Sequence, residues 1–233
     1  MPEILKIEGL TKKYKKKLAV RDVSFSLNEG EYLGVVGESG CGKSTLMELI
    51  AGLERPTSGI ILRARPLRLH MVFQNPAASF NPRMTIGRSL REGLLNQGLN
   101  TPEAKARIRQ LLQEYGLPEE YADRYPSELS GGECQRAAII RAVAVNPDVL
   151  ICDEATSALD VLHQRQIILL LYKLLRTRKM AIIFVSHDLA LVQEICTRII
   201  VMKEGSIIEE GSTYNVINHP QAGYTKALLN AVL

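Results

Sequence analysis

A glycine-rich loop between a strand and a helix constrains this chain more than any other feature. The loop consists of Gly37, Glu38, Ser39, Gly40, Cys41, Gly42, Lys43, Ser44 and Thr45. The apolar run 32–36 before it predicts a buried strand, and the pattern of residues 44–50 after it predicts a helix. A parallel α/β core built around a phosphate-binding loop is the fold that this arrangement favours.

The residue types in the loop suit an anion. Glycines at positions 37, 40 and 42 permit backbone conformations that direct successive N–H groups at one point. The positive end of the following helix dipole lies at the same point. Lys43 would neutralise the β- and γ-phosphates of a nucleotide, and the Ser44 hydroxyl would coordinate Mg²⁺. The alternative, a glycine-rich turn that only matches the pattern, is disfavoured by the strand and helix around it.

Two adjacent acids, Asp153 and Glu154, follow the four apolar residues 149–152. This pattern is typical of a central parallel strand whose carboxyl end faces a ligand crevice. Asp153 would hold Mg²⁺ through its water shell, and Glu154 would orient and deprotonate an attacking water. An acid pair of this kind is more often a solvated turn when it stands alone, but the upstream lysine of the phosphate loop favours the catalytic interpretation.

A second glycine turn, Ser130-Gly131-Gly132, precedes a predicted helix over 135–142. With the phosphate loop and the acid pair, it resembles the signature of ATP-binding-cassette (ABC) ATPases. The resemblance implies that Ser130 and the amides of Gly131 and Gly132 contact the γ-phosphate of ATP held by an opposite protomer. A helix N-terminus with free N–H groups is suited to that task. In isolation, a turn that caps an ordinary helix would be the simpler interpretation.

Four single residues match smaller parts of the ABC pattern. The resemblance implies that Tyr14 stacks on adenine and that Gln74 senses Mg²⁺ and the attacking water. It also implies that Asp160, in the segment 157–160, communicates across the dimer and that His187 contacts the γ-phosphate. A lone histidine at a strand end is usually structural and an exposed tyrosine is usually incidental. Their order and spacing favour the functional interpretation, with Glu154, His187 and Gln74 as catalytic residues.

The resemblance covers the whole chain and predicts one ABC ATPase domain over 1–233. The fold class it implies is α/β: a P-loop NTPase (RecA-like) core with an N-terminal antiparallel β region and an inserted helical subdomain. Residues 3–75 and 146–233 would form the nucleotide-binding core. The segment 76–145, which is rich in proline, glycine and helical patterns, would form the helical signature subdomain.

Composition limits the location and the chemistry. No apolar stretch approaches the roughly 20 residues of a membrane helix, and the first residues do not resemble a signal peptide. We therefore expect a peripheral protein on the cytoplasmic face of the membrane. The four cysteines lack the spacing of a metal site or disulfide scaffold. Net charge is +4, and the basic run 12–17 is interpreted as a solvated turn beside a nucleotide, with no nucleic-acid partner.

The segment 74–87 and the tail 219–229 resemble peptide- and nickel-type import ATPases. That resemblance implies transmembrane permease subunits, a second and nonidentical ABC ATPase, and indirectly an extracytoplasmic substrate-binding protein. Four departures stand out: the short segment 60–69, Glu133 in place of the usual Gln, Ala155 in place of the usual Pro, and a short tail after the motif 219–229. Ala155 and the short tail favour nickel or a metal chelate slightly over peptides.

Two other functions stay open at this stage. One is a soluble ABC ATPase of an enzyme complex such as carbon-phosphorus lyase, whose ATPase resembles the peptide-type importers. The other is a nucleic-acid-associated ABC protein, a class that normally carries paired cassettes or large insertions absent from these 233 residues. Copurification with a membrane protein, with phosphonate enzymes or with ribosomes would separate the three.

Overall fold

The computed structural model describes residues 2–15, 17–155, 160–177 and 179–232, and within these ranges the strands form two sheets. The smaller sheet is antiparallel and has the order β2 (Lys17–Asn28), β1 (Glu3–Tyr14), β4 (Ser58–Arg63). The larger sheet has the order β5 (Leu69–Val72), β6 (Val149–Asp153), β7 (Ala181–Val185), β3 (Tyr32–Val36), β8 (Arg198–Lys203), β9 (Ser206–Ser212). In this order, the strands β5, β6, β7, β3 and β8 are parallel to one another, and β9 runs antiparallel to β8.

The register of the larger sheet brings three strand ends to one edge. Val185, at the end of β7, lies opposite both Val35 of β3 and Asp153 of β6. Since parallel strands all point the same way, the loops that follow β3, β6 and β7 begin side by side. This edge carries the phosphate loop, the acid pair and His187.

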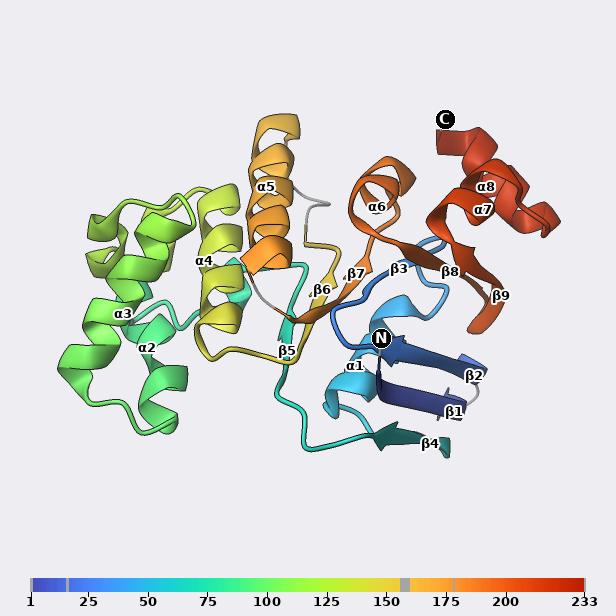
Figure 1. Cartoon of the computed structure of the whole chain (residues 1–233), viewed down its shortest axis with the longest axis horizontal. Helices are drawn as coiled ribbons and strands as arrows, with labels where there is room; N and C mark the ends of the chain where they lie inside the picture. Colours follow the sequence, from blue (N-terminus) through green and yellow to red (C-terminus); the bar gives the residue numbers. More distant parts are fainter. Residues whose placement is uncertain (1, 16, 156–159, 178, 233) are drawn as a thin grey trace.

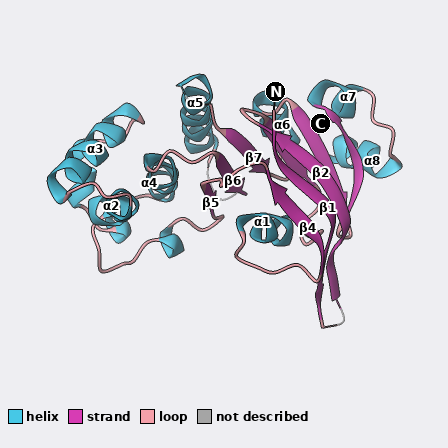
Figure 2. Ribbon diagram, turned by 60° about the horizontal axis from the view of Figure 1, so that its bottom comes forward, coloured by secondary structure: helices cyan, strands magenta, loops and turns pink. Residues whose placement is uncertain are grey.

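Each face of the larger sheet has its own apolar core because successive side chains of a strand point to opposite faces. Leu33 and Ile183 face α1 (Lys43–Ala51) and the antiparallel sheet. Ile182 and Phe184 face the core that includes the helices of the other layer. Those helices include α5 (Val161–Thr177) and α6 (Leu189–Ile195). Figure 2 shows α1 on one side of the strands and α5 and α6 on the other.

A group of helices lies beside the β5 edge of the larger sheet (Figure 1). It consists of α2 (Ile86–Asn96), α3 (Thr101–Glu114) and α4 (Gly131–Ala144), with short turns η1 (Ala77–Ser79), η2 (Glu119–Asp123) and η3 (Pro126–Glu128). Asn100 and Glu103 form a capping box that fixes the start of α3. Leu90, Ile108 and Ile139 are buried where these helices meet. The helices fall within the predicted segment 76–145, and the division into subdomains itself stays a prediction.

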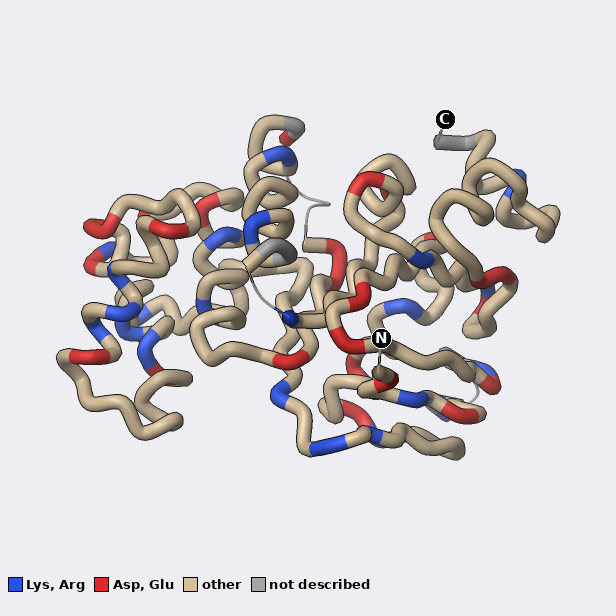
Figure 3. The backbone as a smooth tube through the Cα atoms, in the orientation of Figure 1, with Lys and Arg blue, Asp and Glu red and all other residues tan. Residues whose placement is uncertain are grey.

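The chain ends with α7 (Thr213–Asn218) and α8 (Gly223–Val232), which lie beside β9 in Figure 1. In the part of the chain that the structure describes, none of the helices combines the length and apolar character needed to span a bilayer. Figure 3 shows basic and acidic positions interspersed along both the helical group and the sheets.

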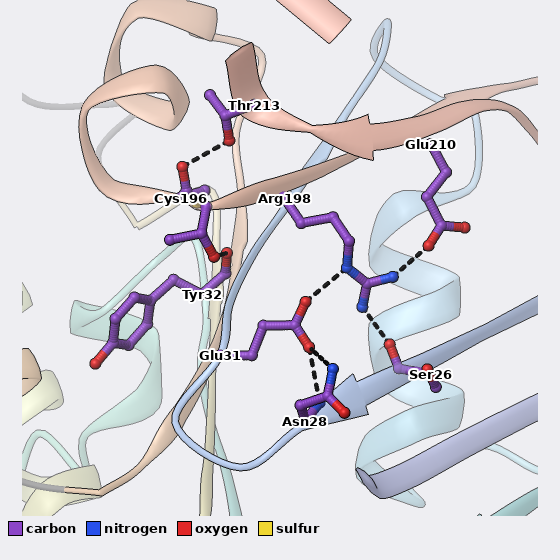
Figure 4. A network of polar contacts seen from close by, with 9 residues as sticks. Ser26, Asn28, Glu31, Tyr32, Cys196, Arg198, Glu210 and Thr213 are labelled. Atoms are coloured by element: carbon purple, nitrogen blue, oxygen red, sulfur yellow. Dashed lines mark hydrogen bonds and ion pairs between the residues drawn. The ribbon is translucent and has the colours of Figure 1, made fainter. Parts of the chain in front are cut away.

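A partly buried polar network joins the two sheets (Figure 4). The Nε of Arg198 donates to Glu31 at 2.6 Å, and its other guanidinium nitrogens donate to Glu210 and to the carbonyl of Ser26. Glu31 is only 8% exposed and also accepts a hydrogen bond from the backbone N–H of Asn28 at 2.7 Å. Arg198 thus ties β8 to the turn that connects β2 with β3. The predicted fold class, an α/β P-loop core with an antiparallel β region and an inserted group of helices, is confirmed.

Candidate functional site

The phosphate loop leaves the end of β3 and enters α1 through glycines that no other residue could replace without strain. Gly42 caps α1 with a left-handed φ of 109°. A Cβ atom on Gly42 would lie 2.2 Å from the carbonyl oxygen of Ala19, and one on Gly37 would lie 2.2 Å from that of Met202. Within the described chain, α1 has no side-chain cap and no acid in its first turn. Its N-terminal N–H groups are therefore presented to an external anion.

Lys43 is folded over its own loop. Its Nζ donates to the carbonyl oxygen of Gly37 at 2.7 Å and to that of Glu38 at 3.0 Å, and the residue is 4% exposed. An ammonium group held by two neutral carbonyls can exchange them for phosphate oxygens, which carry a full charge. The lysine is therefore within reach of any anion that the loop binds.

Asp153 ends β6 beside the start of α1 and is 5% exposed. Among the described residues, its Oδ1 atom is buried with no hydrogen-bond partner. Burial raises the pKa of the Asp153 carboxyl, and a hydrogen bond from the Ser44 side chain opposes that shift. An orphaned carboxylate oxygen beside a serine hydroxyl fits Mg²⁺, which binds hard oxygen ligands and keeps several waters. These residues therefore fit the metal that the sequence predicts.

Glu154 adopts a left-handed backbone with φ 48°, an uncommon conformation for a residue other than glycine. Its N–H donates to the carbonyl of Val185 at 3.0 Å, and its Oε2 accepts a hydrogen bond from the Nε2 of Gln74 at 3.0 Å. A cavity of about 250 Å³ joins this pair to the phosphate loop. Its lining consists of Lys17, Ala19, Ser39, Gly40, Gly42, Lys43, Ser44, Thr45, Gln74 and Glu154. The structure thus brings together the loop, Gln74 and Glu154.

Among the predicted residues outside the described lining of this cavity are Tyr14, His187 and Asp160. Tyr14 ends β1 with 40% of its surface exposed, and the Nζ of Lys12 lies 4.8 Å from its ring centroid. Its strand partner Lys17, which the sequence analysis placed in a solvated turn, does line the cavity. His187 is exposed after β7. Asp160 binds the His163 ring at 2.8 Å, and the predicted residues 157–159 lie outside the described residues.

Comparison with known proteins identifies the family. A family model described as "ABC transporter" matches residues 20–157. The chain belongs to the ABC transporter family. The ABC resemblance seen in the sequence is thereby confirmed, and the chain is an ABC transporter ATPase.

Curated relatives and solved structures agree with this assignment. The chain is 44% identical over 230 residues to the oligopeptide transport ATP-binding protein OppF of Haemophilus influenzae, covering 92% of this chain and 69% of that protein. It is 41% identical over 239 residues to the dipeptide transport ATP-binding protein DppF of the same organism, covering 96% and 73%. The ABC cassette MJ0796, solved as a dimer in a post-hydrolysis state with ADP and Pi, superposes with a TM-score of 0.81. The identity is 29%, and the match covers 90% of this chain and 99% of that chain.

The turn predicted to be the ABC signature, residues 130–132 and here called the signature turn, lies at the start of α4, where Ser130 is the N-cap. The Oγ and the backbone N of Ser130 each donate to Oε2 of Glu133 at 2.8 Å, and the hydroxyl of Tyr121 donates to Oε1 at 2.8 Å. Burial alone would raise the pKa of Glu133, but the hydrogen bonds from Ser130 and Tyr121 hold it below its ordinary value. The unexpected Glu133 therefore completes a capping box.

Gly131 is exposed, whereas Gly132 packs against the ring of His163, 2.3 Å from the position of an added Cβ. A second cavity, of about 510 Å³, is lined by Gly131 and shares Gln74 and Glu154 with the first. The signature turn thus neighbours the Gln74–Glu154 pair. In the described part of the chain, it does not line the cavity of its own phosphate loop.

Proposed function

We propose that this chain binds ATP with Mg²⁺ and hydrolyses it to drive the import of peptides through a membrane permease. The observation that carries the proposal is the edge where the phosphate loop, the orphaned oxygen of Asp153 and the Gln74–Glu154 pair meet. The names of the relatives, which refer to oligopeptide and dipeptide transport, support peptides as the cargo. None of those names refers to nickel or a metal chelate, so we propose peptides ahead of the nickel expectation.

The binding step would use the loop residues 37–45 and the N-terminus of α1. In our proposal, Lys43 exchanges the carbonyls of Gly37 and Glu38 for the β- and γ-phosphates. Ser44 and Asp153 would hold Mg²⁺, which supplies positive charge against the phosphate oxygens. Tyr14 would stack on adenine, at the end of the strand pair that also presents Lys17 to the cavity.

The hydrolytic step would use Glu154 as the general base for water. Its carboxylate is held by Gln74 at 3.0 Å, and its left-handed backbone follows directly after β6. In our proposal, Gln74 would also help to hold Mg²⁺, while its hydrogen bond keeps the Glu154 carboxylate in place for the attacking water. His187, which follows the neighbouring strand β7, would contact the γ-phosphate.

The signature turn would act on ATP held by a second ATPase. Ser130, Gly131 and Gly132 line no common cavity with the phosphate loop in the described structure. We therefore infer a head-to-tail dimer. The resemblance to peptide-type importers further suggests that Asp160 lies at the dimer interface and that the partner is nonidentical. The protein would sit on the cytoplasmic face of the membrane against its permease, and an extracytoplasmic binding protein would deliver the cargo.

Two substitutions test the assigned roles, because one should weaken ATP binding and the other should abolish ATP turnover. Glu154→Gln should retain ATP binding and lose turnover by about 10²- to 10⁴-fold, the usual contribution of a general base. Lys43→Ala should instead weaken binding, since it removes the only side-chain cation of the predicted loop. Binding and steady-state hydrolysis are measured with the partner subunits present. Normal hydrolysis by the Glu154→Gln protein would rule out its role.

A mixing experiment tests the shared site. Ser130→Arg and Lys43→Ala proteins are each expected to be inactive, and a mixed homodimer would restore one site with both residues intact. We expect little rescue without another ATPase, because the partner is proposed to be nonidentical. Strong rescue would overturn the nonidentical partner while supporting the shared site.

A further inference from the structure

The C-terminal helix contacts the phosphate loop directly. Tyr224 is the second residue of α8, and its hydroxyl oxygen accepts a hydrogen bond from the N–H of Glu38 at 3.1 Å. Glu38 immediately follows Gly37, where the loop leaves β3. A residue near the end of the chain therefore fixes the backbone at the entrance of the loop.

Residues of two strands, β9 and β8, contact the start of α8 and the ring of Tyr224. The carboxylate of Glu209 in β9 accepts hydrogen bonds from the backbone N–H groups of Gln221 at 2.8 Å and Ala222 at 3.0 Å, just before α8. The Nζ of Lys203, at the end of β8, lies 4.8 Å from the centroid of the Tyr224 ring. These contacts leave the start of α8 little freedom to move independently of the β8–β9 hairpin.

The same hairpin holds a later part of the loop. The N–H of Gly205, in the turn between β8 and β9, donates to the carbonyl of Cys41 at 2.8 Å. The carbonyl oxygen of Met202 also packs against Gly37, where an added Cβ would lie 2.2 Å from it. The loop is thus fixed at several points by one C-terminal unit, the β8–β9 hairpin with α8.

We propose that Tyr224 is a positioning residue for the phosphate loop. Its hydroxyl holds the backbone of Glu38, so the position of α8 sets how readily the loop keeps its anion-binding conformation. Any displacement of α8 together with the β8–β9 hairpin by a partner would then change the affinity for nucleotide. The proposal rests on the proposed function only in naming ATP as the nucleotide, since the contact itself lies within this chain.

Cys41 provides a direct readout of the loop conformation. It lies within the loop, is 7% exposed, and its Sγ is 3.9 Å from the Nζ of Lys43. The other three cysteines, at positions 134, 152 and 196, are also free and buried, but in other elements. Loosening of the loop should therefore expose Cys41 selectively to a thiol reagent.

The test compares Tyr224→Phe with the unchanged full chain in the absence of nucleotide. N-ethylmaleimide labelling is followed at each cysteine by mass spectrometry. Loss of one neutral hydrogen bond should raise the labelling rate at Cys41 by about threefold to tenfold and leave the other three rates unchanged. Tyr214→Phe is the matched control, because Tyr214 is 66% exposed on α7 and its ring contacts His219. That control should change no rate.

A second measurement connects the loop to its ligand. The Kd for ATP with Mg²⁺ should rise by a similar factor in Tyr224→Phe and stay unchanged in Tyr214→Phe. A Cys41 labelling rate equal to that of the unchanged chain would overturn the proposal, and so would an equal rise at all four cysteines. Because labelling needs no nucleotide, a chain that failed to bind ATP would contradict the proposed function and leave the role of Tyr224 standing.

Discussion

Two helices of this molecule begin at glycine turns, and their N-termini are completed in different ways. α1 begins at Gly42, which offers no side chain, and its first turn carries Lys43. α4 begins at Ser130, whose side chain and backbone are bonded to Glu133 in a capping box. The first N–H groups of any helix lack partners within it. α1 therefore leaves its donors for a ligand, whereas α4 satisfies part of its own.

The difference also concerns charge. Lys43 adds a cation to the positive end of the α1 dipole, while Glu133 adds an anion to that of α4. A phosphate group is thus attracted to the N-terminus of α1 both by the positive charge there and by the N–H groups that can donate hydrogen bonds to it. At α4 it would have to share Ser130 with a carboxylate. In the proposed composite site, α1 supplies the affinity, and α4 supplies a compact exposed turn that can approach a phosphate already bound elsewhere.

The largest difference in ATP affinity between the two turns should come from substituting one glycine in each. Gly42→Ala forces a Cβ to within 2.2 Å of the Ala19 carbonyl at a left-handed φ of 109°, so the backbone must move. We expect ATP affinity to fall by at least about tenfold, as local strain exceeds about 1.4 kcal/mol. The Cβ of Gly132→Ala would come nearest to the His163 side chain and not to the phosphate loop, so ATP affinity should stay unchanged in the isolated chain. Equal losses of ATP affinity in the two variants, measured by isothermal titration calorimetry, would show that the two turns do not differ in their contribution to ATP binding.

The next effect concerns the metal beside α1. Asp153→Asn removes the charge of a carboxyl whose Oδ1 has no partner among the described residues. We expect the Mg²⁺-dependent gain in ATP affinity to shrink by about tenfold, since a direct or water-mediated metal contact is lost. ATP titrations with Mg²⁺ and with EDTA measure that gain. Asp123→Asn, an exposed carboxylate bonded to Arg109 on the helical group, is the control and should keep it.

A smaller effect should follow from the cap of α4. Ser130→Ala removes the side-chain acceptor for the N–H of Glu133 and the hydroxyl donor to its carboxylate. The free energy of unfolding should fall by about 1 kcal/mol, the usual cost of losing an N-cap. ATP binding by the isolated chain should not change. Urea unfolding and titration on the same preparation check both expectations, and weaker ATP binding would place Ser130 at the site of its own loop.

The smallest effect should appear as a pH dependence of stability. The folded state lowers the pKa of Glu133, so its ionised form stabilises the protein above the ordinary value of 4.5. That contribution disappears as the pH falls through the lower, folded-state pKa. The difference in unfolding free energy between the unchanged protein and Glu133→Gln should be constant from pH 6 to 7, because these pH values lie above the ordinary pKa. The difference should shrink as the pH falls below 4.5. A difference independent of pH would mean that the carboxylate charge does not matter there.

The sequence predicts α1 and its loop well because their determinants are local. The glycines, Lys43 and the apolar strand before them are contiguous, and the strand–loop–helix order follows from them. The acid pair could also be placed, since an apolar run that ends in acids indicates a strand end. The structure confirms both elements: the strand predicted over 149–152 spans Val149–Asp153, and the helix predicted over 44–50 spans Lys43–Ala51.

Contacts between distant segments could not be predicted in this way. Nothing near Glu154 in the sequence indicates its left-handed backbone. Its hydrogen bond with Gln74 joins residues that follow the neighbouring strands β6 and β5, which are about 80 residues apart in the chain. The contact of Tyr224 with Glu38 joins positions 186 residues apart. The tail 219–229 resembled a known family motif, but its sequence could not show that Tyr224 contacts the phosphate loop. That contact depends on the tertiary structure. The capping role of Glu133 could have been predicted from the Ser-Gly-Gly-Glu spacing.

The central position of β3 has a consequence for how the protein is made. Tyr32–Val36 pairs with β7 on one side and β8 on the other, and both neighbours lie in the last third of the chain. A ribosome therefore releases this apolar strand long before either partner exists, and its pairing must close a very long loop. Until then, the phosphate loop has no fixed strand behind it. A chain interrupted before Ala181 would therefore leave β3, and the phosphate loop that follows it, without either neighbouring strand.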